Sequence, residues 1–250
     1  MDSSDNIPLK IMQIPYGDKT FNLIQDTYLP AGTKQRGIEY FRKLKEQGYT
    51  EITTHGSTHG YGQTATSWCC KEVGLACTIF LAKIRSQTKM TKEAIKFGAN
   101  VIEIGNEDGY PTNKVLSLKA QQYASKNENI KLLELGLDDP DFIQEMANNI
   151  IANKGNINPK RIWCVVGSAV LVRALHKAFP ETEFCIVQVG RKIYPDILEG
   201  INYKLYISPE PFKQNAEILP PYRSLYHYDA KLWRYVIEEG QSGDYIWNVK

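Results

Sequence analysis

The chain has 250 residues, 42% of them hydrophobic and 23% charged, which is enough to form one or two globular domains. Its 30 Lys and Arg residues nearly balance 28 Asp and Glu residues, so charge gives no reason to class it as a nucleic-acid binder. Its apolar runs are too short to cross a membrane, and residues 1–10 do not resemble a signal peptide, so we expect a cytoplasmic protein.

Short runs rich in β-branched and aromatic residues alternate with longer stretches at helical spacing. The predicted strands are Phe21–Ile24, Glu51–Thr54, Cys77–Leu81, Asn100–Ile104, Ile130–Leu135, Arg161–Val166 and Glu183–Val189. The predicted helices are Gln35–Gln47, Gln63–Val73, Lys89–Phe97, Thr112–Ser125, Asp141–Lys154, Leu171–Phe179 and Ala230–Glu239. This alternation predicts an α/β fold, with helices flanking mostly parallel sheets. Residues 194–228 lack periodicity and are predicted to wrap irregularly over a site.

The five cysteines lie inside apolar runs and are odd in number, which is unlike a secreted disulfide framework. Cys69 and Cys70 are adjacent, but no second pair or His cluster stands at the spacing of metal ligands. We therefore expect buried thiols and no metal site.

Lys34 follows the turn residues Leu29–Thr33 and is predicted to be the opening residue of a helix. The positive end of the helix dipole would lower the pKa of its amine. A partly neutral lysine can attack an aldehyde carbon and form a Schiff base. Taken alone, however, such a segment is more often an exposed lysine beside a turn.

Three further segments lie between a predicted strand or loop and a helix. The loop His55–Gln63 contains glycines that would let the backbone close on a ligand, although a plain turn explains it equally well. Gly167 and Ser168 end a strand, where Ser168 would cap the next helix or help to hold a phosphate. Asp229 also has two interpretations: it would cap the following helix, or it would be a site residue.

In combination, these segments resemble the pyridoxal-phosphate enzymes of fold type II, the tryptophan synthase β superfamily. Residues 32–40 (GTKQRGIEY) are similar to the Gly-Asn-Lys-x-Arg-Lys-Leu-Glu-Tyr motif of the branch with 1-aminocyclopropane-1-carboxylate deaminase and D-cysteine desulfhydrase. Residues 228–231 (YDAK) resemble that family's Tyr-Glu/Thr-Gly-Lys segment. The likeness runs from about Asn22 to the end of the chain and implies a two-domain α/β fold.

The resemblance also implies roles for individual residues. The matching lysine carries the cofactor, and the residue after Tyr228 faces the pyridine nitrogen. The expected catalytic residues are Lys34 and Tyr228. The expected cofactor-binding residues are Lys34, Gly60, Tyr61, Gly167, Ser168 and Asp229. The substrate carboxylate is expected to be bound by Ser57, Thr58 and His59.

The chain departs from the family pattern in three ways. The family's phosphate loop reads Gly-Ser-Gly-Gly-Thr, but Ala169-Val170-Leu171 follow Gly167-Ser168 here. Tyr61 stands where the family offers an asparagine to the cofactor ring. The chain is also shorter than typical members. Because the loop after Gly167-Ser168 lacks the family's two glycines and threonine hydroxyl, the phosphate must be held by fewer groups or in another way.

Several functions are compatible with this resemblance. The first is a lyase or deaminase acting at the α-carbon of an amino acid, since a carboxylate at the ring nitrogen favours a strong electron sink. The second is a decarboxylase or lyase that acts on an amino-acid adduct of a nucleobase in bacteriophage DNA, and such an enzyme would work in the host cytoplasm. The reason is that residues 29–36 (LPAGTKQR), 228–233 (YDAKLW) and 247–249 (WNV) look like the motifs of short bacteriophage-type members. The third is a non-catalytic protein that binds pyridoxal phosphate or another partner.

The family pattern also suggests the domain organisation. We expect a smaller domain from residues 40–130, and a larger cofactor-binding domain from residues 1–39 together with 131–250. The family further suggests a homodimer.

Overall fold

The computed structural model describes residues 7–105 and 111–250. These divide into two compact units: Gly37–Phe142, which we call the inserted unit, and residues up to Arg36 together with Ile143–Lys250, which we call the terminal unit. Each unit is built on its own sheet. Whether residues 40–130 form an independent domain stays a prediction. Within the described residues, no helix is long and apolar enough to span a membrane.

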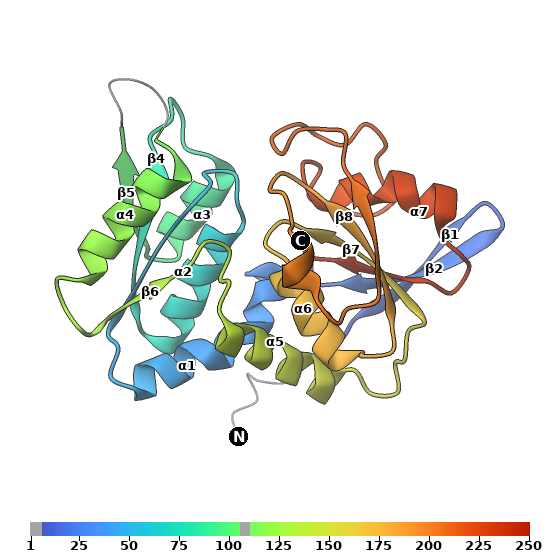
Figure 1. Cartoon of the computed structure of the whole chain (residues 1–250), viewed down its shortest axis with the longest axis horizontal. Coiled ribbons are helices and arrows are strands. Elements are labelled where there is room, and N and C mark those ends of the chain that lie inside the picture. The colour runs from blue at the N-terminus through green and yellow to red at the C-terminus, as the bar shows by residue number, and fades with distance from the viewer. Residues whose placement is uncertain (1–6, 106–110) are drawn as a thin grey trace. The chain divides into compact units, whose positions relative to one another are not determined.

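The terminal unit contains a six-stranded sheet in the order β1-β2-β10-β7-β8-β9 (Figure 1). The strands are β1 (Ile11–Tyr16), β2 (Lys19–Gln25), β7 (Arg161–Val166), β8 (Glu183–Gln188), β9 (Tyr203–Ile207) and β10 (Tyr245–Asn248). β1 is antiparallel to β2, and all the other neighbours are parallel. Parallel strands end at the same edge of a sheet, so the loops after β2, β7 and β10 share one edge.

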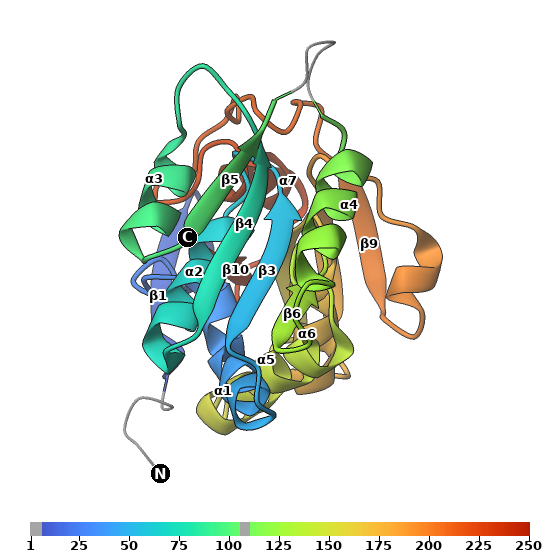
Figure 2. The ribbon, with the colours of Figure 1, turned by 90° about the vertical axis from the view of Figure 1, so that its left-hand side faces the viewer.

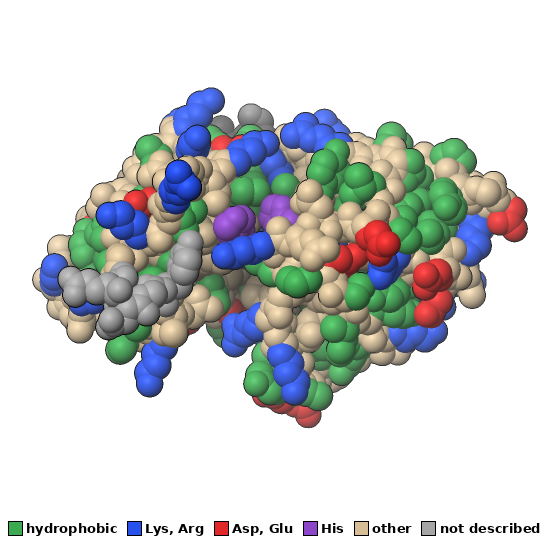
Figure 3. Space-filling model, turned by 90° about the horizontal axis from the view of Figure 1, so that it is seen from above, with side chains coloured by type: hydrophobic (Ala, Val, Ile, Leu, Met, Phe, Trp, Pro, Cys, Tyr) green, Lys and Arg blue, Asp and Glu red, His purple; other side chains and the backbone are tan. Residues whose placement is uncertain are grey.

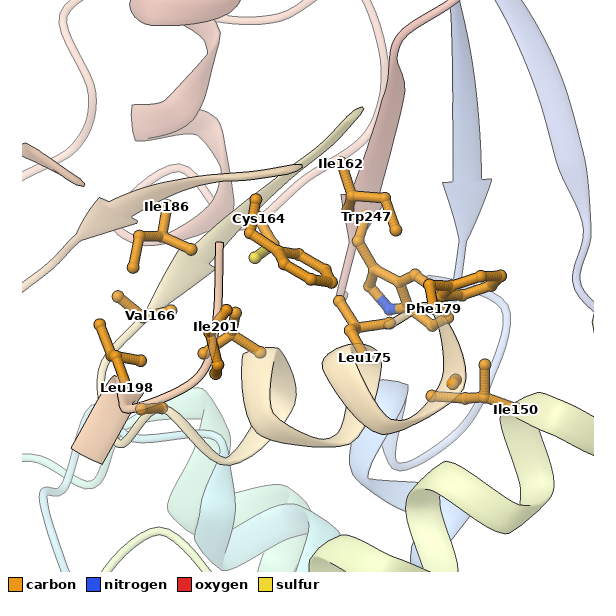
Figure 4. Close-up of a cluster of buried hydrophobic side chains, with 14 of the residues drawn as sticks. Ile150, Ile162, Cys164, Val166, Leu175, Phe179, Ile186, Leu198, Ile201 and Trp247 are labelled. Atoms are coloured by element: carbon orange, nitrogen blue, oxygen red, sulfur yellow. The ribbon is translucent and has the colours of Figure 1, made fainter. Parts of the chain in front are cut away.

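Both faces of the sheet are buried at its central strands, which explains why β7 is apolar at nearly every position. On one face, Ile162 and Cys164 pack in a cluster with residues of α5 (Pro140–Asn153) and α6 (Val170–Ala178), as Figure 4 shows. On the other face, Trp163 packs with residues of η4 (Asp229–Leu232) and α7 (Trp233–Glu239). The sheet is therefore a rigid support for the loops at its edges.

The inserted unit contains a four-stranded sheet of parallel strands in the order β5-β4-β3-β6 (Figure 2). The strands are β3 (Glu51–Gly56), β4 (Ala76–Ala82), β5 (Asn100–Ile104) and β6 (Ile130–Leu133). α4 (Asn113–Ala124) covers one face, and α2 (Gly62–Val73) and α3 (Lys89–Lys96) cover the other (Figure 1). α1 (Ile38–Glu46) precedes β3.

The predicted α/β class with mostly parallel sheets is confirmed, and every predicted strand and helix overlaps an observed one. The sequence-based interpretation missed β1, β9 and β10. β1 contains Pro15, which is compatible with a strand here because β1 lies at the sheet edge. β9 lies within residues 194–228, so the prediction of an irregular wrap is wrong for that part.

Candidate functional site

The carboxyl edge of the terminal unit's sheet carries most of the predicted cofactor residues. Lys34 follows β2, Gly167 follows β7, and Val249 and Lys250 follow β10. In sheets of this class, ligands bind outside the carboxyl ends of the strands. Hydrogen bonds connect several of these segments and fix the candidate site residues in place.

Lys34 lies in a 3-10 turn, η2 (Gly32–Gly37), and is half-buried. The prediction that it opens an α-helix is wrong, because α1 begins only at Ile38 and the six residues before it form the tighter turn. The turn is anchored to the segment after β10, since the Thr33 backbone N–H donates to the Val249 carbonyl at 3.1 Å. The position of Lys34 is therefore set by the strand beside β2 as well as by its own turn.

Asp229 is buried, with 1% of its surface exposed, at the start of η4. Its Oδ2 accepts the backbone N–H of Lys250 at 2.9 Å, whereas its Oδ1 has no hydrogen-bond partner among the described residues. Desolvation raises the pKa of this carboxyl well above its usual range, although backbone N–H groups of Lys250, Val249 and Leu225 oppose the shift. The interpretation of Asp229 as a helix cap is wrong, because the carboxylate binds the end of β10 and α7 begins after Leu232.

Tyr228 lies against Gly167, the residue that ends β7. A Cβ atom added at Gly167 would lie 3.2 Å from the Tyr228 hydroxyl, so a larger residue would displace the phenol. Desolvation, followed by the nearby Asp229 carboxylate, raises the pKa of Tyr228, and a hydrogen bond from the Gly167 N–H partly offsets this. The phenol is therefore protonated at neutral pH. It lies beside the predicted phosphate loop.

Ser168 does not cap α6, so that part of the sequence interpretation is wrong. The N-cap residue is Ala169, which adopts a left-handed conformation with φ of 60° and offers no side-chain hydrogen bond. Such a backbone conformation normally favours glycine. Ala169 therefore holds a strained backbone conformation at this turn, and the α6 N-terminus has no side-chain cap.

In the inserted unit, the loop between β3 and α2 is held by its own hydrogen bonds. Ser57 Oγ accepts the His59 N–H at 3.2 Å, and the Gly60 N–H donates to the Ser57 carbonyl at 2.9 Å. Thr58 Oγ1 lies 3.1 Å from His59 Nδ1. Tyr61 is half-buried and directly precedes α2 without capping it by its side chain. The structure therefore brings the predicted substrate residues together in one fixed loop.

Gln63, in the first turn of α2, was missed in the sequence-based interpretation. Its buried amide nitrogen lies within 3.3 Å of three loop carbonyls, those of Ser57, Thr58 and Gly60. Its own Oε1 has no partner among the described residues. The available signal was a polar side chain directly after a glycine-rich loop, where it can reach back to the backbone.

The cysteines supply no reactive group. All five are buried and unpaired, as predicted. Desolvation raises the pKa of Cys185 to about 12 and raises the pKa values of Cys69, Cys70 and Cys164 as well. Protonated, buried thiols are poor nucleophiles. No group of three metal-ligating side chains occurs among residues 7–105 and 111–250.

The terminal unit fits the needs of pyridoxal phosphate, which are an amine, donors for a phosphate and an acid–base partner for the ring nitrogen. Lys34 supplies the amine. Asp229 supplies a buried carboxylate oxygen without a partner in the described part of the chain, which is rare in proteins unless a ligand or water meets it. The uncapped N-terminus of α6, beside Gly167, supplies backbone N–H groups suited to an anion. The donor set is smaller than in the family's loop, but each role has a residue.

No protein-family model matches the chain, and no curated protein matches its sequence. Known structures do match. An ACC deaminase homologue has a TM-score of 0.76 at 14% identity, covering 96% of this chain and 88% of its own. Diaminopropionate ammonia lyase from Escherichia coli has a TM-score of 0.65 at 11% identity, covering 98% and 82% of the two chains.

A threonine deaminase from T.th. matches with a TM-score of 0.66 at 16% identity, covering 92% of this chain and 86% of its own. At these identities the matches establish the fold and not the activity. The resemblance inferred from the sequence is confirmed at that level. This chain has the fold of the fold-type II pyridoxal-phosphate enzymes, which includes deaminases and lyases.

Proposed function

We propose that the chain is a pyridoxal-phosphate-dependent lyase or deaminase that acts at the α-carbon of a free amino acid, with Lys34 as the cofactor lysine. One observation carries the proposal. The buried Asp229 carboxylate, whose Oδ1 has no partner among the described residues, is connected to the Lys34 turn through two consecutive residues. Lys250 donates its N–H to Asp229, and Val249 accepts the N–H of Thr33.

When bound, pyridoxal phosphate supplies an electron sink conjugated with the substrate's α-carbon. Lys34 would have two tasks in this proposal: its amine would hold the cofactor, and it would move a proton at the substrate's α-carbon. Asp229 would hold a proton at its Oδ1 as the partner of the cofactor's ring nitrogen, because a buried carboxylate would gain a charge-assisted hydrogen bond there. This acid–base partner favours elimination, deamination or decarboxylation over mild β-replacement.

The remaining predicted residues bind and orient. Gly167, Ser168 and the backbone N–H groups at the start of α6 hold the phosphate. Tyr228, held protonated beside Gly167, donates a hydrogen bond or a proton. In the inserted unit, the loop of Ser57, Thr58 and His59 binds the substrate carboxylate, and Gly60 and Tyr61 contact the cofactor ring.

We propose a free amino acid as the substrate in preference to an amino-acid adduct in DNA. On the face seen in Figure 3, the Lys and Arg side chains are dispersed among hydrophobic and uncharged ones. A DNA-binding surface usually gathers such side chains in one patch or stripe. The formal net charge of +2 points the same way.

The test is spectroscopic. Adding pyridoxal phosphate to the purified chain should produce a visible absorbance band that Lys34→Ala abolishes. Lys71→Ala is the matched control, because Lys71 is exposed on α2 and should leave the band unchanged. Failure of the wild-type chain to give a band, or persistence of the band in Lys34→Ala, would contradict the proposal.

A second step separates an enzyme from a non-catalytic binder. The loaded protein should release ammonia or carbon dioxide from at least one member of an amino-acid panel. A band that no amino acid perturbs would indicate a binding protein instead. Turnover only with amino-acid-modified DNA would favour the second candidate function.

A further inference from the structure

A buried group of four side chains surrounds the turn that carries Lys34. It consists of Asp26 after β2, Thr33 and Arg36 on the two sides of Lys34, and Trp247 of β10. We call it the buried clamp. Asp26 is 0% exposed, Arg36 1%, Thr33 4% and Trp247 0%. None of these residues is assigned a role in the proposed reaction.

An ion pair forms the base of the clamp. Arg36 binds Asp26 through two parallel hydrogen bonds, from Nε to Oδ2 at 3.0 Å and from Nη2 to Oδ1 at 2.6 Å. Its Nη1 donates to the Ile7 carbonyl at 2.6 Å and to Asn149 Oδ1 at 3.1 Å. Bidentate pairs of this kind fix geometry as well as charge. Arg36 is therefore held at a single position, two residues after Lys34.

Trp247 joins this ion pair to the residue directly before Lys34. Its indole N–H lies 3.1 Å from Asp26 Oδ2 and 3.0 Å from Thr33 Oγ1. The Arg36 guanidinium also lies over the indole ring, 5.8 Å from its centroid. One donor is thus shared between the ion pair and the turn.

The indole itself cannot move easily. Figure 4 shows Trp247 in the buried cluster beneath the sheet, near Leu175 and Phe179. Close-packed interiors leave such a ring little freedom. Lys34 therefore lies in a turn whose residues Thr33 and Arg36 are both tied, directly or through Asp26, to one immobile side chain.

We propose that Trp247 is a positioning residue for Lys34: its indole N–H fixes the turn through Thr33 and Asp26, and so sets the place of the lysine amine. The inference deepens the proposed function and rests on it for the role of Lys34. Its structural content, the coupling of Trp247 to the reactivity of Lys34, can be measured without any cofactor.

The chain offers a matched control in Trp163 of β7. It is also 0% exposed, and its indole N–H also donates to a carboxylate, Asp244 Oδ2, at 2.9 Å. Trp163 is near the start of β7, whereas Lys34 follows the end of the parallel strand β2. Trp163→Phe and Trp247→Phe each replace a buried indole with a smaller phenyl ring and remove one indole N–H donor, but only Trp247 adjoins the Lys34 turn.

The first experiment uses the cofactor-free chain and competitive acetylation by acetic anhydride, with the modification at Lys34 followed by mass spectrometry. Loss of the indole N–H that Asp26 and Thr33 share loosens the turn, and we expect Trp247→Phe to speed the labelling of Lys34 by about three- to ten-fold. Trp163→Phe should leave that rate unchanged. Equal rates in both variants, whether changed or unchanged, would overturn the proposal.

The second experiment measures the affinity for pyridoxal phosphate from the visible band. Trp247→Phe should weaken it by about three- to ten-fold, and Trp163→Phe should not. Thr33→Val removes the hydroxyl at nearly constant volume and should reproduce the Trp247→Phe effects in both experiments. Thr33→Ser keeps the hydroxyl and should restore wild-type values. Failure of Thr33→Ser to do so would contradict a role for the shared hydrogen bond.

The two experiments also separate this inference from the proposed function. If the wild-type chain gives no band with pyridoxal phosphate, the proposed function fails, and the acetylation rates still decide whether Trp247 controls Lys34. If the band forms but the acetylation rates do not respond to Trp247→Phe, the positioning role fails and the proposed function stands.

Discussion

Each edge of the terminal unit's sheet carries a buried Asp carboxylate that accepts hydrogen bonds, but the two carboxylates have different partners. At the amino edge, near the start of β7, the Asp244 carboxylate accepts the Trp163 indole N–H and the Gln241 N–H, each at 2.9 Å. Arg161 lies 3.6 Å from the same oxygen. At the carboxyl edge, Asp229 accepts a backbone N–H through Oδ2, and its Oδ1 has no partner within the described residues.

The electrostatic consequences also differ. Desolvation is the largest single influence on the pKa of Glu183 at the amino edge and would raise it, but the hydrogen bonds and positive charges of Arg161 and Lys204 together outweigh desolvation and lower the pKa. Desolvation dominates at Asp229 and raises its pKa. Among the main influences from the described residues, only backbone N–H groups lower it. Carboxylates with charged partners stabilise the fold. A buried carboxylate without one destabilises it, and such an arrangement is commonly found at functional sites.

The largest expected effect separates the two edges by replacing each carboxylate. Asp229→Ala removes the proposed partner of the ring nitrogen, and we expect turnover per bound cofactor to fall about ten- to hundred-fold, equivalent to a charge-assisted hydrogen bond of about 1.5–3 kcal/mol. Asp244→Ala should instead lower the free energy of unfolding by about 1–3 kcal/mol, because it leaves buried donors unpaired. Single-turnover rates and melting curves of both variants measure this.

The comparison fails if the two variants behave alike. Should Asp229→Ala lose stability while keeping its rate per bound cofactor, Asp229 would be a structural residue like Asp244. A rate loss in Asp244→Ala at a temperature where it is folded would show that the amino edge also contributes to the site.

The pH dependence of stability gives a second contrast, measured without cofactor. Because the pKa of Asp229 is raised in the folded chain, folding takes up a proton between the ordinary value of 3.8 and the raised value. The free energy of unfolding contributed by Asp229 therefore falls as the pH rises through this window.

Asp229→Asn cannot titrate and should have a flatter stability curve than the wild type above about pH 4. Its stability relative to the wild type should rise with increasing pH. Urea unfolding at a series of pH values measures the difference. A difference that is constant with pH would mean that Asp229 is not protonated by burial in the folded chain.

The smallest expected effect concerns the loop after β7. Ala169 has φ of 60°, so Ala169→Gly should relieve strain and increase the free energy of unfolding by up to about 1 kcal/mol. Ala174→Gly, inside α6, is the control and should cost about 1 kcal/mol. Chemical denaturation compares them. Loss of stability in both variants would show that the Ala169 backbone is not strained.

The sequence allowed the parallel strands and their helices to be predicted, because buried strands and amphipathic helices have strong periodic signals. β10 escaped detection because its residues 245–248 are few, although it lies in the middle of the sheet. β1 and β9 lie at the sheet edges and have many exposed residues, which weakens the alternation that marks a strand.

At the site, side chains with a recognisable motif were predictable and backbone contacts were not. Lys34, Gly167 and Asp229 could be proposed from residue type and order. The links through Val249 and Lys250 depend on main-chain groups, which any residue supplies. The Ser168 cap and the helix at Lys34 were predicted wrongly, because local sequence does not reveal a left-handed Ala169 or a 3-10 turn before α1.

The attachment site of the cofactor tests the central claim most directly. The chain is incubated with pyridoxal phosphate, reduced with borohydride and digested, and the modified peptide is identified by mass spectrometry. We predict a pyridoxyl group on Lys34, in the peptide that contains Thr33 and Gln35. A label on Lys45, Lys71 or Lys231 in place of Lys34 would contradict the account.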